Sequence, residues 1–162
     1  MVATSDLTLL DRLRDMREYD ERDDLRPRVN AKLTDLAAAI GLVQLKKLPA
    51  FIARRRAIAE IYGQTLAGSP LGLPPDATRS GHIYHRFIVR LKREPVDRVM
   101  TALEKEQIHG RRPVYQPLHR LLGLTGYSTS DRVWEHALSL PCYPSLTDQE
   151  ARRVVATLRE SL

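Results

Sequence analysis

Short-range patterns organise the N-terminal part of the chain. Residues 2–4 are β-prone and predict a short strand. Apolar side chains then recur at helical spacing over residues 9–16, and Ser5 or Asp6 can cap that helix. Residues 19–29 are crowded with charge and contain a proline, so we expect a loop there.

A longer helical pattern follows. Thr34 or Asp35 can cap a helix whose apolar positions continue to Leu66, except where Pro49 breaks the period. We therefore expect either two helices or one long kinked helix. The next stretch, residues 71–80, contains prolines and a glycine and predicts a linker. This linker is the best candidate for a domain boundary.

The remainder of the chain mixes strand and helix patterns. Residues 82–91 are rich in aromatic and β-branched side chains and predict a strand. Pro95 stands at the start of an amphipathic helix, and Thr147 to Glu150 is a capping box before a C-terminal helix. Less regular patterns predict a second strand and two short helices, at residues 108–114, 118–122 and 131–138. We expect a compact α/β unit with an antiparallel sheet.

The helix predicted from Thr34 to residue 48 has more apolar surface than one small-domain contact needs. Its apolar side chains are Leu36, Ala39, Ile40, Leu42, Val43 and Leu45. Leaving such a surface in water forgoes several kcal/mol at about 25 cal/mol per Å². We therefore expect this face to associate with a partner.

The net charge of +6 is unevenly distributed. Residues 1–30 carry eight acidic and six basic side chains, and this net −2 leaves +8 for the remainder. Arginines at residues 54–56, with Lys46 and Lys47 before them, suit a partner that carries phosphates, such as nucleic acid or a nucleotide-linked substrate. The alternative is a helix face exposed to water.

Composition and local motifs exclude several kinds of site. The only cysteine, Cys142, allows no internal disulfide, and we expect a buried thiol. We expect no metal site, because no Cys/His cluster has ligand spacing and a predicted strand sends His82 and His85 to opposite faces. Ser139 lies in no nucleophile motif, and no glycine loop for phosphate is present. We find no apolar run of membrane-spanning length and no signal peptide, so we expect a cytoplasmic protein without a membrane partner.

Residues 28–48 (RVNAKLTDLAAAIGLVQLKKL) are similar to a family signature, R-x-N-x-[RK]-[ML]-T-D-L-x-A-A-x-G-x-x-Q-L. It belongs to the DegT/DnrJ/StrS family of pyridoxal-phosphate-dependent sugar aminotransferases, which make amino sugars on nucleotide carriers. Four further blocks resemble the family in the same order: residues 51–56 (FIARRR), 82–85 (HIYH), 112–119 (RPVYQPLH) and 140–148 (LPCYPSLTD). The third of these looks most like members that act on 4-keto sugar nucleotides.

The resemblance implies an architecture. The chain is similar to the C-terminal portion of a fold-type-I aminotransferase. Residues 1–30 match a strand, helix and loop left from the large domain, and residues 31–70 match the helices between the domains. Residues 71–162 match the small C-terminal α/β domain, in which helices pack on an antiparallel sheet.

Residues 1–6 (MVATSD) resemble the strand that follows, in the family, the lysine bonded to pyridoxal phosphate. That lysine tethers the cofactor and moves a proton during transfer. We therefore expect a truncated aminotransferase that binds no pyridoxal phosphate covalently and is inactive alone. The alternatives are half of a split enzyme, completed by a separately encoded large domain, or a nucleic-acid-binding or protein-interaction module. Nucleic acid is the less favoured partner, since the basic residues lie within family-like blocks.

The resemblance also implies partners and site residues. Family members are homodimers with active sites at the subunit interface, so we expect a homo-oligomer or a large-domain partner, and a nucleotide-sugar substrate. The residue matching Asn30 reaches the cofactor phosphate of the partner subunit, which suits an amide donor; a turn or helix cap is the alternative. Four residues match positions near the substrate cleft: Tyr84, His85, Tyr115 and His119. Ordinary packing is the alternative for these four, and Val114 departs from members that have histidine at its position.

Overall fold

The computed structural model describes residues 2–76, 81–92 and 95–162. The chain divides into two compact units, Met1–Lys47 and Leu48–Leu162, which we call the N-terminal and C-terminal units. This division falls inside a helix and not in the predicted linker. Gly72, within that linker, exchanges two backbone hydrogen bonds of 2.8 Å with Arg90 and so belongs to the C-terminal unit. The assignment of residues 1–30, 31–70 and 71–162 to three parts of a family member stays a prediction.

The N-terminal unit begins with helix α1, Leu7–Arg17, which confirms the predicted helix. The Asp6 carboxylate caps it by accepting hydrogen bonds from the backbone N–H groups of Thr8 and Leu9, at 2.9 and 3.1 Å. Residues 18–34 form neither helix nor strand, in agreement with the predicted loop.

The strand predicted at residues 2–4 is wrong. The sheet among the described residues consists of two strands from the C-terminal unit, and residues 2–4 do not join it. A β-prone run needs a neighbouring strand to satisfy its backbone groups, and here the run has none among the described residues.

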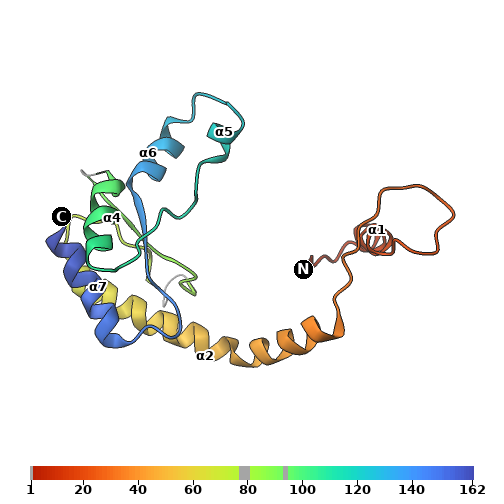
Figure 1. Cartoon of the computed structure of the whole chain (residues 1–162), viewed down its shortest axis with the longest axis horizontal. Coiled ribbons are helices and arrows are strands. Elements are labelled where there is room, and N and C mark those ends of the chain that lie inside the picture. Colours follow the sequence, from red (N-terminus) through yellow and green to blue (C-terminus); the bar gives the residue numbers. More distant parts are fainter. Residues whose placement is uncertain (1, 77–80, 93–94) are drawn as a thin grey trace. The chain divides into compact units, whose positions relative to one another are not determined.

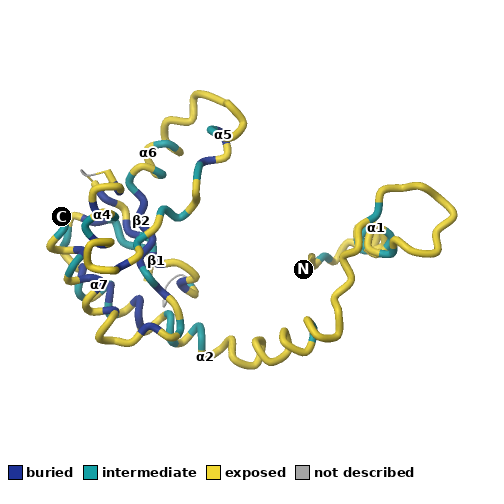
Figure 2. Tube along the Cα trace, viewed as in Figure 1, coloured by how far each residue is buried: buried dark blue, intermediate teal, exposed yellow. Residues whose placement is uncertain are grey.

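Helix α2 spans Asp35–Leu66 and continues through Pro49, so the single-helix alternative is confirmed. Its buried residues, Ile58, Ala59, Tyr62 and Leu66, all lie in its second part. Figure 2 shows the corresponding change from exposed to buried along the helix.

Part of α2 is long and apolar enough to cross a membrane, so the prediction that no run approaches this length is wrong. Length and composition alone do not distinguish a membrane span from a helix whose apolar face is covered by protein. Lys46 and Lys47 interrupt the apolar sequence, and two ammonium groups inside a bilayer would be costly. The length and apolar composition of α2 are therefore only weak evidence for a membrane-spanning helix.

Strands β1, Phe87–Arg90, and β2, Ala137–Leu140, pair antiparallel with Phe87 opposite Leu140. The antiparallel sheet confirms the predicted fold class, but the strand predicted at residues 82–91 is too long. The Tyr84 N–H donates a 2.9 Å hydrogen bond to Nδ1 of His82, and Tyr84 has a φ of 47°. The chain therefore turns at this point, and the strand begins only after it.

Strand β2 was not predicted. The helix predicted at residues 131–138 is present as α6, Ser128–His136, but its predicted end belongs to β2. The strand predicted at residues 108–114 is reduced to one bridge between Arg111 and Ser139. Pairing with β1 outweighs the helical spacing of the apolar residues before residue 138, because strand assignment depends on neighbours distant in the chain.

The other predicted helices are confirmed: α4 spans Val96–Lys105, α5 spans Leu118–Leu121 and α7 spans Asp148–Glu160. The capping box is present at the start of α7. The Glu150 N–H donates to Oγ1 of Thr147 at 3.2 Å, and the Thr147 N–H donates to Oε2 of Glu150 at 2.8 Å.

The core of the C-terminal unit gathers side chains from the second part of α2, both strands, α4 and α7 (Figure 2). The Tyr62 ring meets Phe87 edge to face with centroids 5.0 Å apart, and the Tyr62 hydroxyl donates to the Pro141 carbonyl at 2.7 Å. Figure 1 shows α5 and α6 in an excursion of the chain away from α7. This excursion carries Tyr115 and His119, two of the predicted site residues.

Candidate functional site

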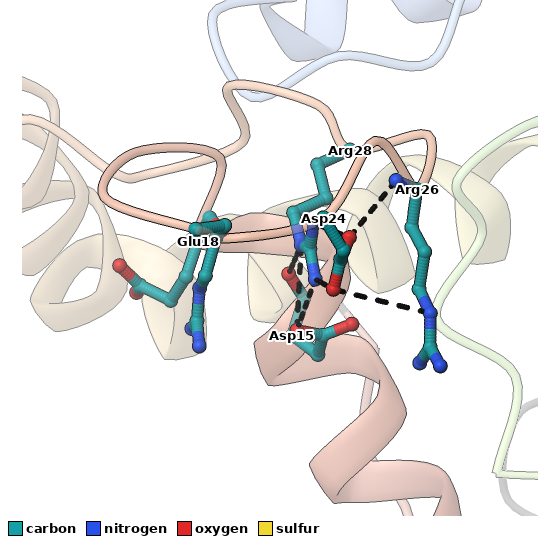
Figure 3. Close-up of polar contacts among 6 residues, drawn as sticks. Asp15, Glu18, Asp24, Arg26 and Arg28 are labelled. Carbon is teal, nitrogen blue, oxygen red and sulfur yellow. Dashed lines mark hydrogen bonds and ion pairs between the residues drawn. The ribbon is translucent and has the colours of Figure 1, made fainter.

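Asn30, the predicted phosphate contact, follows a loop that is anchored on α1. The anchor is Arg28, whose guanidinium donates to the carboxylates of Asp15 and Asp24 at 2.9 and 2.6 Å (Figure 3). Its Nε also donates to the backbone carbonyl of Asp15 at 3.1 Å, and the Val29 N–H donates to a carbonyl of α1 at 2.9 Å. The arginine of the family-like signature therefore fixes the backbone two residues before Asn30.

Arg28, which anchors the loop, is shielded from solvent, whereas Asn30 is open to it. The Arg28 side chain is only 6% exposed, whereas Asn30 is exposed. Hydrogen bonds from Arg28, and a smaller contribution from the Arg26 backbone, hold the pKa of Asp24 well below its usual value. The Asp24 carboxylate stays charged at neutral pH, so the anchor persists. An exposed amide beside a fixed loop fits a phosphate contact.

The arginines at residues 54–56 bind loop carbonyls of the C-terminal unit. Arg54 donates to the Leu146 carbonyl and pairs with Asp148 at 2.6 Å. Arg55 donates to the carbonyls of His85, at 2.9 Å, and of Tyr84 and Cys142. Arg56 donates to the His82 and Gly81 carbonyls at 3.1 and 3.4 Å. The three arginines therefore tie α2 to these loops, although Arg56, like Lys46 and Lys47, is exposed. Phosphate binding by this basic run stays a prediction.

Two cavities of the C-terminal unit meet at Arg86 and Arg111, which line both. The first has a volume of about 460 Å³ and is also lined by Arg55, His85, His109 and Arg153. The second has a volume of about 650 Å³ and is also lined by Arg112, Tyr115, Gln116 and Trp134. Both cavities are therefore strongly basic.

The sheet explains why these arginines share a surface. Phe87 and Val89 of β1 are buried, so alternation sends Arg86 and Ile88 to the opposite face. Ile88 is opposite Ser139 of β2, and Arg111 forms a bridge to Ser139. Arg86 and Arg111 thus lie along the same face of the sheet.

Two of the predicted substrate residues line these cavities. His85 lines the first cavity, and Tyr115, which is 91% exposed, lines the second. Tyr84 instead lies in the core, and its hydroxyl donates to the Pro75 carbonyl at 2.8 Å. This position favours the packing alternative for Tyr84.

His119 is also engaged inside the fold. Its Nε2 lies 3.0 Å from Oδ1 of Asp131, and its ring stacks on Tyr127 with centroids 5.0 Å apart. Burial raises the pKa of Asp131, but hydrogen bonds from Arg120 and His119 outweigh that effect and lower the pKa below its usual value. These contacts favour packing for His119, and substrate contact by any of the four residues stays a prediction.

A stacked group holds the excursion that carries Tyr115. The guanidinium carbons of Arg112 and Arg120 lie 3.9 and 4.6 Å from the Trp134 ring centroid. The Trp134 Nε1–H donates to the Val114 carbonyl at 3.2 Å, and Arg112 pairs with Asp97 at 2.7 Å. Cation–π contacts and an ion pair therefore fix the backbone next to Tyr115.

Cys142 is a free, buried thiol, as predicted. Burial raises its pKa, against a smaller opposing effect of Arg55. The thiol stays protonated at neutral pH, which disfavours a nucleophilic role. In the part of the chain that the structure describes, no three His, Cys, Asp or Glu side chains are placed to hold a metal ion.

Arg86 and Arg111 were not among the predicted site residues. The signal available for Arg86 was alternation, because a strand that buries Phe87 and Val89 must turn Arg86 outward. Arg111 had no local signal, since its position depends on the bridge to Ser139, a residue distant in the chain.

Comparisons with known proteins extend over nearly the whole chain. GDP-perosamine synthase from Vibrio cholerae is 31% identical over an alignment of 134 residues, and the match covers 77% of this chain and 36% of that protein. The crystal structure of the aminotransferase TlmJ from Streptoalloteichus hindustanus is 27% identical, with a TM-score of 0.86 over 98% of this chain and 46% of TlmJ. The structure of DesI in the presence of its TDP-sugar product is 26% identical, with a TM-score of 0.86 over 98% of this chain and 44% of DesI.

The chain thus spans less than half the length of these relatives. The aminotransferases of this fold family depend on pyridoxal phosphate, and one solved relative is a pyridoxal-phosphate form. The model of the DegT/DnrJ/EryC1/StrS aminotransferase family matches residues 1–159, and the chain belongs to this family.

Proposed function

We propose that this chain supplies the C-terminal portion of an aminotransferase that acts on a nucleotide sugar in amino sugar biosynthesis, in the cytoplasm. The observation that carries the proposal is the family match over residues 1–159, supported by the similarity in fold to TlmJ and DesI. The nucleotide-sugar substrate is inferred from the GDP-perosamine synthase and from the TDP-sugar product of DesI.

The chain's own residues have two roles in this proposal. Asn30, on the loop anchored by Arg28, donates its amide N–H to the phosphate of pyridoxal phosphate held by a partner. The basic cavities bordered by His85 and Tyr115 receive the substrate. The cofactor, when bound, supplies the electron sink for amino transfer.

We also propose that residues 1–162 alone do not transfer amino groups. The lysines of the sequence are Lys32, Lys46, Lys47, Lys92 and Lys105. None of them matches the family's lysine that bonds to the cofactor. The partner that provides this lysine is a large domain, either in a separate polypeptide or in another copy of a longer protein.

The test mixes residues 1–162 with the lysine-bearing large domain of a family member. We expect amino transfer to a keto sugar nucleotide only in the mixture. Asn30→Ala should weaken pyridoxal phosphate binding there, whereas Gln149→Ala, which removes an exposed amide from α7, should not. Borohydride reduction of residues 1–162 with pyridoxal phosphate, followed by peptide mapping, gives a readout besides activity. A single stoichiometrically labelled lysine in this chain would contradict the proposal.

A further inference from the structure

Arg86 and Arg111 line the two basic cavities, and their guanidinium groups have no hydrogen-bond or ion-pair partner among the described residues. Both side chains are exposed, and both line both cavities. Neither makes a hydrogen bond or ion pair through its guanidinium with any residue in the described ranges. An exposed arginine whose guanidinium has no such partner among the described residues is available to bind an anion from solution.

The other charged groups of the cavities are already engaged. Arg55 donates to three loop carbonyls, and Arg153 donates to the Glu106 carbonyl at 2.7 Å. Arg112 pairs with Asp97, and Glu150 accepts hydrogen bonds within its capping box. Glu150 is the one carboxylate in the described lining of the first cavity, and the described lining of the second has none.

We propose that Arg86 and Arg111 form an anion subsite that binds the diphosphate group of a nucleotide sugar. The inference rests on the proposed function for the substrate class, while the residues come from the geometry of the sheet. Guanidinium groups donate paired hydrogen bonds that match phosphate oxygens, and two of them can neutralise a diphosphate. The cavities, at about 460 and 650 Å³, are in the usual range for small-molecule sites.

The subsite recognises phosphates and not the base. It should therefore bind GDP, TDP and inorganic pyrophosphate with similar affinity, and guanosine should not bind. Trp134 is the only tryptophan of the sequence and lines the second cavity, so its fluorescence reports occupancy directly.

The experiment titrates these four compounds into residues 1–162 and into Arg86→Ala, Arg111→Ala and the double variant. Each single substitution should weaken diphosphate binding about tenfold, the size of one charge-assisted hydrogen bond. Arg152→Ala removes an exposed arginine of α7 and should change nothing. Thermal unfolding checks that all variants stay folded.

Several outcomes would overturn the subsite. These are unchanged GDP binding in the double variant, an equal loss in Arg152→Ala, GDP binding without pyrophosphate binding, and no diphosphate binding by the wild type. None of these affects the transfer assay with the large domain, so failure of the subsite is distinguishable from failure of the proposed function. Loss of amino transfer with intact pyrophosphate binding would instead reject the proposed function alone.

Discussion

Each of the two units of this protein is stabilised internally by a different kind of interaction. In the N-terminal unit, α1 buries no residue, and ion pairs from Arg28 fix the loop after it. In the C-terminal unit, α2, α4, α7 and both strands share one apolar core. Polar contacts at a surface are individually weak, whereas apolar burial supplies most of the stability of a fold. The apolar core of the C-terminal unit is therefore sufficient for that unit to fold by itself. The N-terminal unit has few interactions of this kind.

Helix α2 shows the same contrast within one element. Leu36 near its start is 73% exposed, whereas Leu66 at its end is 1% exposed. Both residues fit the same helical pattern of apolar positions, so the pattern identifies which side chains need cover but not what covers them. The exposed apolar residues at the start of α2 are a surface that we propose a partner covers.

The largest effect should come from the C-terminal core. Leu103→Ala removes a fully buried side chain from α4 and should lower the free energy of unfolding by about 3 kcal/mol. Leu36→Ala makes the same change on the exposed part of α2 and should cost less than about 0.5 kcal/mol. Urea unfolding followed by circular dichroism measures both. Equal costs would remove the contrast between the two parts.

We next predict association with a partner through the exposed apolar residues at the start of α2. Ile40→Asp places a charge on its apolar face and should weaken binding to a second copy, or to a large domain, by about tenfold or more. Leu25→Asp makes a similar change in the exposed loop and serves as the control. Sedimentation velocity over a concentration series measures this. A wild type that stays monomeric and folded at high concentration would argue against self-association.

Because of Tyr62, the stability of the C-terminal unit should depend on pH in the alkaline range. Tyr62→Phe loses the hydrogen bond to the Pro141 carbonyl and should cost about 1 kcal/mol at neutral pH. Burial raises the pKa of Tyr62 well above its usual value. An unfolded tyrosine ionises near pH 10, so wild-type stability should fall as pH rises above about 10. The fall should be smaller in Tyr62→Phe, and Tyr115→Phe, at an exposed site, should behave like the wild type.

The smallest effect on overall stability should follow from the anchor of the N-terminal unit. Arg28→Met removes both ion pairs and should speed hydrogen exchange at the Val29 N–H about tenfold, without a change in the C-terminal unit. Arg26→Met, at an exposed arginine nearby, is the control. If exchange at Val29 stays as slow as in the wild type, Arg28 is not the anchor.

Elements with strong local signals were predicted well. The capping box located α7, and the one-sided apolar spacing after Pro95 located α4. Strand β2 was missed because its pairing with β1 involves residues about fifty positions apart, which no local pattern records. The bend at Tyr84 was missed because it depends on a hydrogen bond to the His82 ring.

The candidate site was predicted less completely for the same reason. The resemblance pointed to Asn30, His85 and Tyr115, which the structure leaves exposed. It pointed equally to Tyr84 and His119, which make contacts inside the fold. Residue type cannot separate these two groups, because tyrosine and histidine serve both in cores and in sites.

The three arginines at the centre of α2 have a consequence for how this helix tolerates change. Successive helical residues are turned by about 100°, so Arg54, Arg55 and Arg56 point in different directions. Arg54 reaches the loop at Leu146, Arg56 reaches the loop at His82, and Arg55 between them donates to carbonyls of both loops. A single-residue insertion between Arg56 and Ile58 would keep every residue and almost all of the composition. It would nevertheless swing all three guanidinium groups about 100° away from their carbonyls, relative to the core side of the helix. The rotational position of this part of the helix, and not only its residue content, therefore decides whether the arginines reach their carbonyls.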